Sequence, residues 1–265
     1  MKMIQRLITT CLASAALLAL QACHGILPGI YDEPPQEKDH TVAGELYIDA
    51  SDWQRWHFID LKAVADSVAA DSLYNTSAAW VSMRIPAPDA EPSESLPESE
   101  CPGIYTYWYD VYGAGISVNE FCTFAPSASQ PIPEKWTFAV HRNNVMTNGG
   151  EVAKTSFSSL EDIPDDLSFV DGLSFEGDTW NQTDVWTIQD RMLLGLIGNQ
   201  GIRINNLLSS WLRVDVPPMP PAFTLDSSVF ILRLSDGSMA ALQLADYQSA
   251  TGTKCCLTIR YRYPL

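Results

Sequence analysis

The stretch SVFILRLSDGSMAALQL, residues Ser228 to Leu244, holds two apolar runs separated by Ser235-Asp236-Gly237. Asp-Gly between apolar runs is a strong β-hairpin signal, because glycine adopts the positive φ that a tight turn requires. The chain continues into CLTIRYRYPL, in which apolar or aromatic residues alternate with Thr258, Arg260 and Arg262. Alternation with a period of two is typical of a strand. The C-terminal quarter therefore predicts an antiparallel meander.

Upstream segments extend this pattern. GELYIDASDWQRWHFIDL, from Gly44, contains two short extended runs broken at Ser51-Asp52, and GIYTYWYDVYGAG, from Gly103, is an aromatic-rich strand candidate. KWTFAVH, Lys135 to His141, predicts a strand with one buried face. Residues 61–73 have mild helical spacing, although a loop or edge strand is an alternative, and the run that begins at Met192 fits a helical turn or a buried strand. Without internal repeats, we expect one mainly β domain with few short helices.

The N-terminus has the features of an export signal. Lys2 and Arg6 precede a short apolar run, and LQAC, which ends at Cys23, resembles a bacterial lipobox. This resemblance implies cleavage before Cys23 and lipid attachment to its thiol; an ordinary signal peptide with an incidental cysteine is the alternative. We therefore expect a signal peptide over 1–22, an acylated, flexible tether over 23–42 and the folded domain over 43–265.

Membrane attachment is expected through this lipid, because no other run is long and apolar enough to be a membrane helix. The proline-rich, acidic tether is of a kind that surface-displayed lipoproteins of some Gram-negative anaerobes carry. We therefore expect a lipid-anchored protein of the outer membrane, exposed at the cell surface.

The chain is strongly acidic, with a formal net charge of −16. Removal of residues 1–22, which contain Lys2 and Arg6 and no acid, would bring the charge to −18. Such a protein is a poor partner for nucleic acid. In an oxidising compartment Cys101 and Cys122 could form a disulfide, whereas the adjacent Cys255 and Cys256 are expected to be buried thiols that face opposite sides of a strand.

No enzyme signature is present. The sequence lacks a nucleophile elbow, a His-Glu-x-x-His motif and a phosphate-binding glycine loop. The histidines, at positions 24, 40, 57 and 141, are scattered and are best interpreted as polar edge or core residues. We therefore expect a protein that is not an enzyme and has no catalytic residue.

Two methionines attract attention. Met219 lies between Pro217-Pro218 and Pro220-Pro221, and Met192 follows Arg191 ahead of a glycine-interrupted apolar run. Methionine is the most adaptable apolar side chain, whereas proline fixes the backbone. A methionine in a loop made rigid by prolines is therefore unusual for a residue that only packs in the core. Spacing alone leaves apolar packing as the default interpretation.

Several segments carry a family resemblance: KWTFAVHRNNVMTNGG, DRMLLGLIGNQGIRINNLLSSWL, PPMPPAFTLDSSVFILRLSDGSMAALQL and GTKCCLTIRYRYPL. In this order, and with the lipobox, they resemble the HmuY-like haem-binding lipoprotein family from about Gly44 to Leu265. The resemblance implies a hand-like, mostly β domain that holds one haem b without covalent attachment in an open cleft. It further implies haem and iron acquisition as a haemophore, with transfer to a TonB-dependent outer-membrane receptor.

The resemblance also places the axial ligands. Members use two histidines or two methionines, and no histidine follows His141, so Met192 and Met219 are the expected haem iron ligands. A thioether favours ferrous iron, and Arg191 is a candidate partner for a haem propionate.

Two other functions are possible on the sequence. A surface module for glycans or another nutrient could use Tyr105, Tyr107, Trp108 and Tyr109 as a stacking platform, although alternating aromatic residues are more often strand packing. A structural or adhesive lipoprotein without a small ligand is the third hypothesis.

Overall fold

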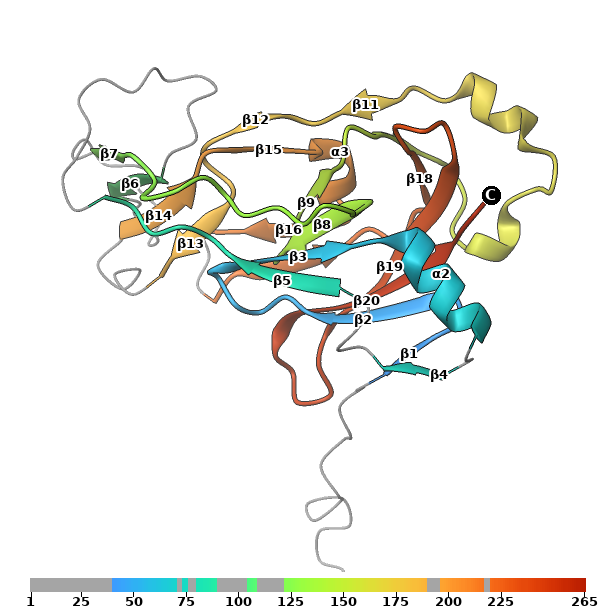
Figure 1. The fold of residues 1–265 in the computed structure, drawn as a ribbon, viewed down its shortest axis with the longest axis horizontal. Helices are drawn as coiled ribbons and strands as arrows, with labels where there is room; N and C mark the ends of the chain where they lie inside the picture. The colour runs from blue at the N-terminus through green and yellow to red at the C-terminus, as the bar shows by residue number, and fades with distance from the viewer. Residues whose placement is uncertain are drawn as a thin grey trace, which may run out of the picture. The chain divides into compact units, whose positions relative to one another are not determined.

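The structure is a computed structural model that describes residues 40–70, 73–75, 80–89, 104–108, 122–189, 196–216 and 220–265. The chain divides into the units Met1–Gln36 and Glu37–Leu265, and all described residues belong to the second unit. This unit is mainly β with few short helices, which confirms the predicted fold class (Figure 1). Within the described ranges, no helix is both long enough and apolar enough to cross a membrane.

The largest sheet has eight strands, and each neighbouring pair is antiparallel. In spatial order these strands are β11 (Glu176–Gly177), β10 (Glu151–Lys154), β18 (Phe230–Arg233), β19 (Met239–Gln248), β20 (Lys254–Arg262), β2 (Glu45–Asp49), β1 (His40–Val42) and β4 (Leu73–Asn75). Strand β1 overlaps the last three residues of the range expected to be a tether. Strand β2 thus pairs with β20, so the sheet joins segments from the two ends of the domain.

The predicted hairpin forms the centre of this sheet. Phe230 pairs with Leu242 and Arg233 with Met239, so β18 and β19 meet at the Asp-Gly turn. Gly237 adopts a φ of 86°, the left-handed conformation for which glycine was expected there. Strand β20 adds the third strand of the meander. The local sequence signals of the C-terminal quarter are therefore confirmed.

A second sheet packs on one face of the first. It contains β5 (Trp80–Arg84), β3 (Arg55–Ile59), β8 (Phe138–His141) and β9 (Asn144–Thr147), in that order. The main apolar core joins both sheets, because it contains β2 and β20 residues together with Phe138 and Val140. Helix α2 (Leu61–Ala70) contributes Leu61 and Val64 to this core, so the helical interpretation of the segment is confirmed.

The prediction of one buried face for KWTFAVH was wrong. All residues of β8 are buried. Phe138 and Val140 belong to the core between the two sheets, whereas Ala139 packs into a second cluster with Trp56, Phe58 and Met146. The strand is covered on both sides by distant segments, which the alternation of its own residues could not reveal.

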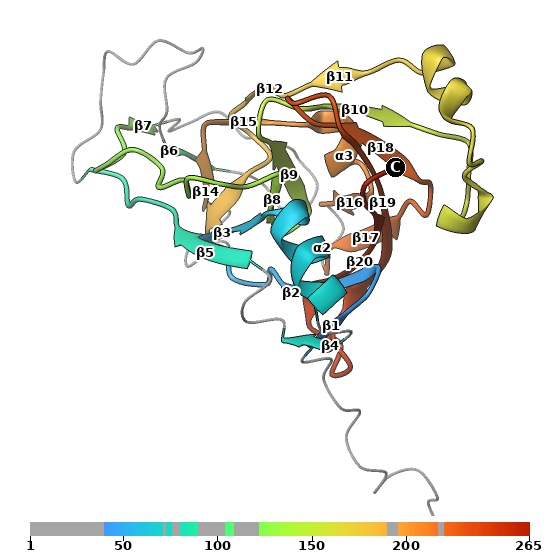
Figure 2. The same cartoon turned by 45° about the vertical axis from the view of Figure 1, so that its right-hand side comes forward.

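The remaining strands form smaller pieces (Figures 1 and 2). A four-stranded sheet has the order β13 (Trp186–Ile188), β14 (Leu196–Gln200), β6 (Ile104–Trp108) and β7 (Cys122–Phe124). Two ribbons pair β12 (Thr179–Asn181) with β15 (Ile202–Ile204) and β16 (Leu212–Asp215) with β17 (Ala222–Leu225). The short helix α3 (Asn206–Ser209) links β15 to β16. The described part of the run that begins at Met192 is β14, so here the strand interpretation is confirmed and the helical turn is not.

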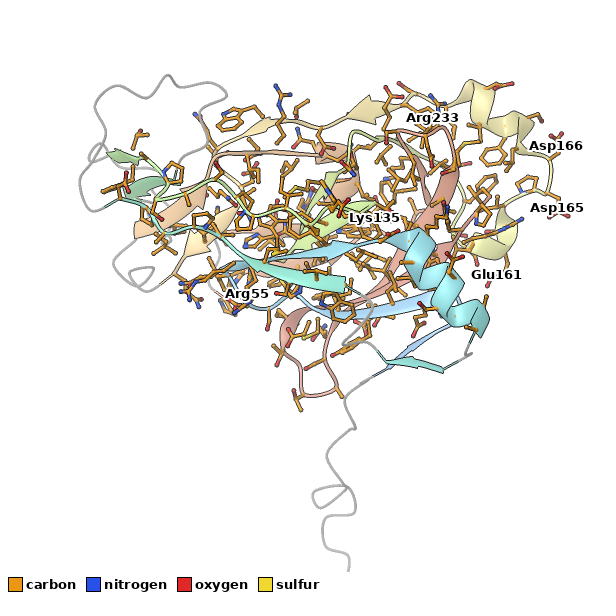
Figure 3. All side chains as sticks on the ribbon, viewed as in Figure 1. Arg55, Lys135, Glu161, Asp165, Asp166 and Arg233 are labelled. Carbon is orange, nitrogen blue, oxygen red and sulfur yellow. The ribbon has the colours of Figure 1, made fainter. Side chains whose placement is uncertain are left out.

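The 3-10 helices η2 (Leu160–Asp162) and η3 (Leu167–Gly172) cover part of the large sheet. Ile163 joins a third apolar cluster with Val229, Ile231 and Ala241. Figure 3 shows Glu161, Asp165 and Asp166 at the outer edge of this segment, and all three are exposed. Its apolar side chains are thus anchored to the sheet while its acids remain in solvent.

The cysteine predictions have two outcomes. Cys255 and Cys256 are buried thiols that form no disulfide, as expected. Cys255 has a φ of 65° at an irregularity in the β19–β20 pairing. Cys101 lies outside the described residues, so its disulfide with Cys122 of β7 stays a prediction.

Candidate functional site

A cavity of about 560 Å³ is lined by residues from two hairpins, β13–β14 and β16–β17, which precede the terminal meander in the chain. Its walls include Asp184 and Trp186 at the start of β13, and Leu212, Val214 and Thr224 from β16 and β17. Asn143 and Asn144, from the turn between β8 and β9, also line it. The β13–β14 and β16–β17 hairpins therefore share one cavity.

The expected haem ligands fall in the connections of these same hairpins. Residues 189–195 join β13 to β14 and include Arg191 and Met192, whereas residues 216–221 join β16 to β17 and include Met219. Arg191, Met192 and Met219 lie outside the described residues, as does the lipidation candidate Cys23. The structure thus describes the strands that flank both methionines, and ligation by them stays a prediction.

Arg142 is an unusual residue of this cavity. It lies in the two-residue turn between β8 and β9 with a φ of 55°, which costs about 1–2 kcal/mol in a residue other than glycine. Its Nη1 donates to the Ser51 carbonyl at 3.2 Å, and its guanidinium carbon lies 4.2 Å from the Trp53 ring centroid. Burial lowers the pKa of Arg142. No carboxylate among the described residues forms an ion pair with Arg142, so its charge remains available for an anionic group.

An aromatic pair links Arg142 to the cavity wall. The rings of Trp53 and Trp186 stack with centroids 6.1 Å apart and an interplanar angle of 22°. Trp186 is fixed further by its Nε1, which donates to the Thr183 carbonyl at 2.9 Å. The wall therefore offers a positioned indole next to a cation.

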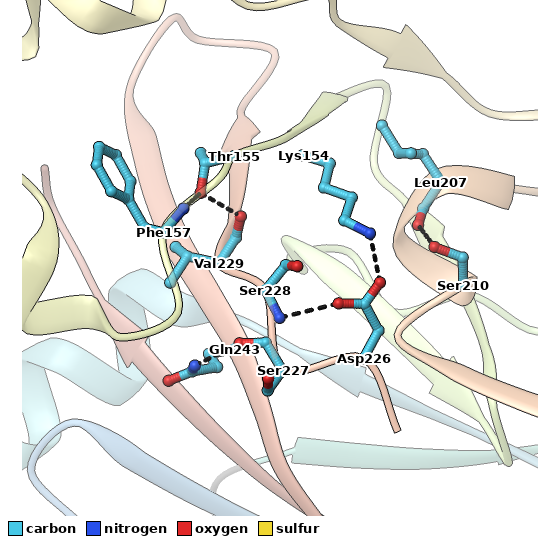
Figure 4. A network of polar contacts seen from close by, with 10 residues as sticks. All are labelled: Lys154, Thr155, Phe157, Leu207, Ser210, Asp226, Ser227, Ser228, Val229 and Gln243. Carbon is cyan, nitrogen blue, oxygen red and sulfur yellow. Dashed lines mark hydrogen bonds and ion pairs between the residues drawn. The ribbon is translucent and has the colours of Figure 1, made fainter. Parts of the chain in front are cut away.

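Two further cations line the cavity. Lys154 forms an ion pair and hydrogen bond with Asp226, and the Ser228 amide donates to the same carboxylate at 3.0 Å (Figure 4). Burial alone would raise the pKa of Asp226, but the hydrogen bonds from Lys154 and Ser228 lower it below its ordinary value. Arg213 Nε lies 3.0 Å from Asp215 Oδ2 at the exposed rim. Unlike Arg142, these two cations have carboxylate partners.

The two histidines with described side chains, His57 and His141, are both buried in the core, one of the two positions that the sequence suggested for them. His141 is fully buried, and its Nε2 lies 2.8 Å from the Trp53 carbonyl oxygen, so this nitrogen carries the proton of a neutral ring. Burial lowers the pKa of His57 and of His141 to about 4. Neither histidine lines the cavity, and no group of three or more His, Cys, Asp or Glu side chains in the described ranges could hold a metal ion.

Sequence reasoning missed Arg142, Lys154 and Trp186, which lie in the β8–β9 turn, on β10 and on β13, respectively. A lone cation in a strand or turn carries no local signal. The alternative glycan platform remains a hypothesis: β6 pairs with β14 and β7, the side chains of its aromatic residues are not described, and Tyr109 lies outside the described residues.

The fold and this site define a class of mainly β proteins in which two hairpins share one cavity. The chain belongs to the HmuY family: residues 52–261 match the family described as HmuY protein, as the resemblance predicted. A comparison with curated protein sequences finds no match.

Solved structures share this fold. A Bacteroides vulgatus protein described as a candidate HmuY_like heme binding protein is 27% identical, with a TM-score of 0.52 over 83% of this chain and 91% of its own. A candidate lipoprotein of Bacteroides fragilis is 24% identical, with a TM-score of 0.55 over 83% and 89%. The apo form of an HmuY analog from Tannerella forsythia is 17% identical, with a TM-score of 0.55 over 87% and 97%.

Proposed function

We propose that this protein is a cell-surface lipoprotein that captures haem b non-covalently and passes it to a TonB-dependent outer-membrane receptor. One observation carries the proposal: two hairpins that share a cavity also hold, in their connections, the two methionines expected to bind iron. Membership of the HmuY family and the 27% identity to a relative described as heme-binding support the same ligand.

The residues around the cavity fit haem in two respects. Haem is a flat, mainly apolar ring with two carboxylates, and the cavity combines the Trp186 indole and aliphatic side chains with Arg142, Lys154 and Arg213. Arg142 in particular has no acidic partner among the described residues, so a propionate would satisfy a charge that is costly to bury alone. Arg191, next to Met192, would add a further cation.

Met192 and Met219 would bind the iron from opposite faces. A neutral, soft thioether stabilises ferrous relative to ferric iron. Because such bonds are individually weak, most of the affinity would come from burial of the macrocycle. The prolines around Met219 would order its loop before binding and so reduce the entropy that binding loses.

Titration of the full-length protein with haemin tests the ligand. We expect a saturable shift of the Soret band that ends at one haemin per chain. A linear, non-saturating absorbance increase would contradict haem capture and would favour a nutrient-binding or adhesive role.

The proposed location depends on Cys23, which would be the acylated N-terminus of the mature chain after removal of residues 1–22. Fractionation of cells that express Cys23→Ala should find the protein released from the membrane. A Cys23→Ala protein that stays in the membrane fraction at the wild-type amount would contradict the lipid anchor.

A further inference from the structure

A second cavity, of about 820 Å³, lies apart from the proposed haem site. It is lined by the end of β9, the start of β10, residues 177–180, residues 200–203 and the segment 126–136. None of its lining residues lines the first cavity. Its volume falls within the range of small-molecule sites, which is about 300–1,000 Å³.

Indole and aliphatic side chains form much of its wall. Trp136 and Trp180 come from different segments, and Met146 and Ile202 lie with them. The Trp136 ring is fixed edge-to-face against Phe58, with centroids 5.1 Å apart. These side chains present a preformed surface for a flat apolar molecule.

The rim of the cavity is also apolar. Ile132 is 53% exposed, and in the described ranges only Val81 is another exposed large hydrophobic residue. Ile132 lines the cavity, whereas Val81 lines neither cavity. Ile132 therefore extends the apolar wall of this cavity to its solvent-exposed edge.

Most polar side chains of the wall already have partners within the protein. Both carboxylate oxygens of Asp178 accept hydrogen bonds from Thr147, at 2.7 Å from its amide and 2.9 Å from its hydroxyl. Gln200 accepts from Trp56 Nε1 and donates to Gln130, each at 2.9 Å. Glu151 pairs with Arg233 at 3.3 Å. Few groups remain to bind the hydroxyls of a sugar, which would lose their hydrogen bonds to water on entry.

A glycine pair, Gly149 and Gly150, forms one side of the cavity. A Cβ at Gly150 would lie 2.8 Å from the Arg233 carbonyl oxygen, and Gly149 has a φ of +69°. Neither position accepts a side chain without backbone movement or strain. Bare backbone therefore forms this part of the wall.

We propose that this cavity is a second binding site, for an uncharged, flat and mainly apolar small molecule. The wall of this cavity has two carboxylates, Asp178 and Glu151, and one cation, whereas three cations line the first cavity, so the second is the less favourable of the two for an anion such as haem. The internally paired polar groups disfavour a carbohydrate. The indoles, the aliphatic wall and the exposed Ile132 complement an apolar ring system.

Nile red, a neutral planar dye, is the probe for this site. Titration of the full-length, haem-free protein should give a saturable, blue-shifted emission from one dye per chain. Trp180→Ala should weaken dye binding about tenfold, the equivalent of about 1.4 kcal/mol. Ile132→Ser, at a position exposed enough to spare the fold, should weaken it about threefold.

Val81→Ser is the matched control, because it removes the other exposed apolar side chain outside both cavities. It should bind the dye as the wild type does. The proposal is overturned if dye binding does not saturate, if Ile132→Ser and Val81→Ser behave alike, or if neutral oligosaccharides displace the dye. Because the readout does not involve haem, its failure is distinguishable from failure of the proposed function.

Discussion

The first cavity is lined by three cations, Arg142, Lys154 and Arg213, whereas the second contains one, Arg203, among indole and aliphatic side chains. Each cavity has two carboxylates in its wall, and the pKa values of one from each, Asp178 and Asp226, are shifted in opposite directions. Burial raises the pKa of Asp178 in the second cavity despite its hydrogen bonds from Thr147. In the first cavity, hydrogen bonds from Lys154 and Ser228 outweigh burial and lower the pKa of Asp226.

This difference teaches that the depth of burial and the hydrogen bonds together decide which form a carboxylate favours: burial dominates at Asp178 although Arg203 lies near it, whereas hydrogen bonds dominate at the less buried Asp226. The two cavities also favour different ligands. The three cations of the first cavity favour a molecule with carboxylates, whereas the internally paired polar groups of the second favour an uncharged molecule. The two sites can therefore be tested independently on one chain.

A packed path of side chains connects the two walls. Gln200 of the second cavity accepts from Trp56 Nε1, and the Trp56 ring lies 5.2 Å from His141. His141 donates to the carbonyl of Trp53, which stacks on Trp186 of the first cavity. Because every link is a direct contact, a substitution in the middle should disturb both sites.

The largest expected effect follows from Trp56→Ala. Trp56 is fully buried, and such a truncation should lower the free energy of unfolding by about 3–5 kcal/mol. Urea unfolding measures this loss, and both haemin and Nile red binding should weaken. Trp56→Phe keeps most of the side-chain volume and removes the hydrogen bond to Gln200. It should lower the free energy of unfolding by less than about half as much as Trp56→Ala. Equal losses for the two variants would contradict the packing argument.

The free energy of unfolding should also decrease in acid. Burial lowers the pKa of His57 and His141 from 6.5 to about 4, so between these values the unfolded chain binds protons that the folded chain does not. The contribution of each neutral, buried histidine to the free energy of unfolding is therefore fully present above pH 6.5. It is lost as the pH decreases towards 4, by on the order of 3 kcal/mol for each histidine.

Urea unfolding across this pH range provides the measurement. His57→Gln removes one titrating group and should flatten part of the slope. A variant slope equal to that of the wild type would show that burial of His57 does not govern the effect.

Arg142→Met sharpens the contrast between the cavities. It removes the one cation of the first cavity that has no carboxylate partner among the described residues, and keeps a long apolar stem. Haemin affinity should fall about tenfold, whereas Nile red affinity should not change. Haemin and dye titrations of the same preparation check this, and an equal loss of both would indicate a general disturbance of the fold.

Lys154→Met should have the smallest effect. Lys154 and Asp226 are partly exposed, so their ion pair contributes about 0.5 kcal/mol. The folded pKa of Asp226 is lowered, so this contribution is present above its ordinary pKa of 3.8 and disappears as the pH falls through the folded value. Wild type and Lys154→Met should therefore differ in urea unfolding at pH 7 and converge in strong acid; a constant difference would contradict this origin.

Local signals predicted some elements and not others. Asp236-Gly237 and the alternation after Cys256 specified the terminal meander, because turn chemistry and strand periodicity are properties of neighbouring residues. The burial of both faces of β8 depends on distant segments that pack on each side. The methionine positions came from a family resemblance, whereas Arg142, Lys154 and Trp186 meet only through the fold.

The ferrous absorption spectrum of haem bound to the full-length protein tests the central claim most directly. Met192→Ala and Met219→Ala should each abolish the low-spin ferrous spectrum while they weaken haemin binding only in part, because burial of the macrocycle remains. Met239→Ala is the matched control, since this methionine of β19 lines neither cavity, and it should keep the wild-type spectrum. If both Met192→Ala and Met219→Ala bind haem with an unchanged reduced spectrum, these methionines are not the ligands and the proposed haem site is wrong.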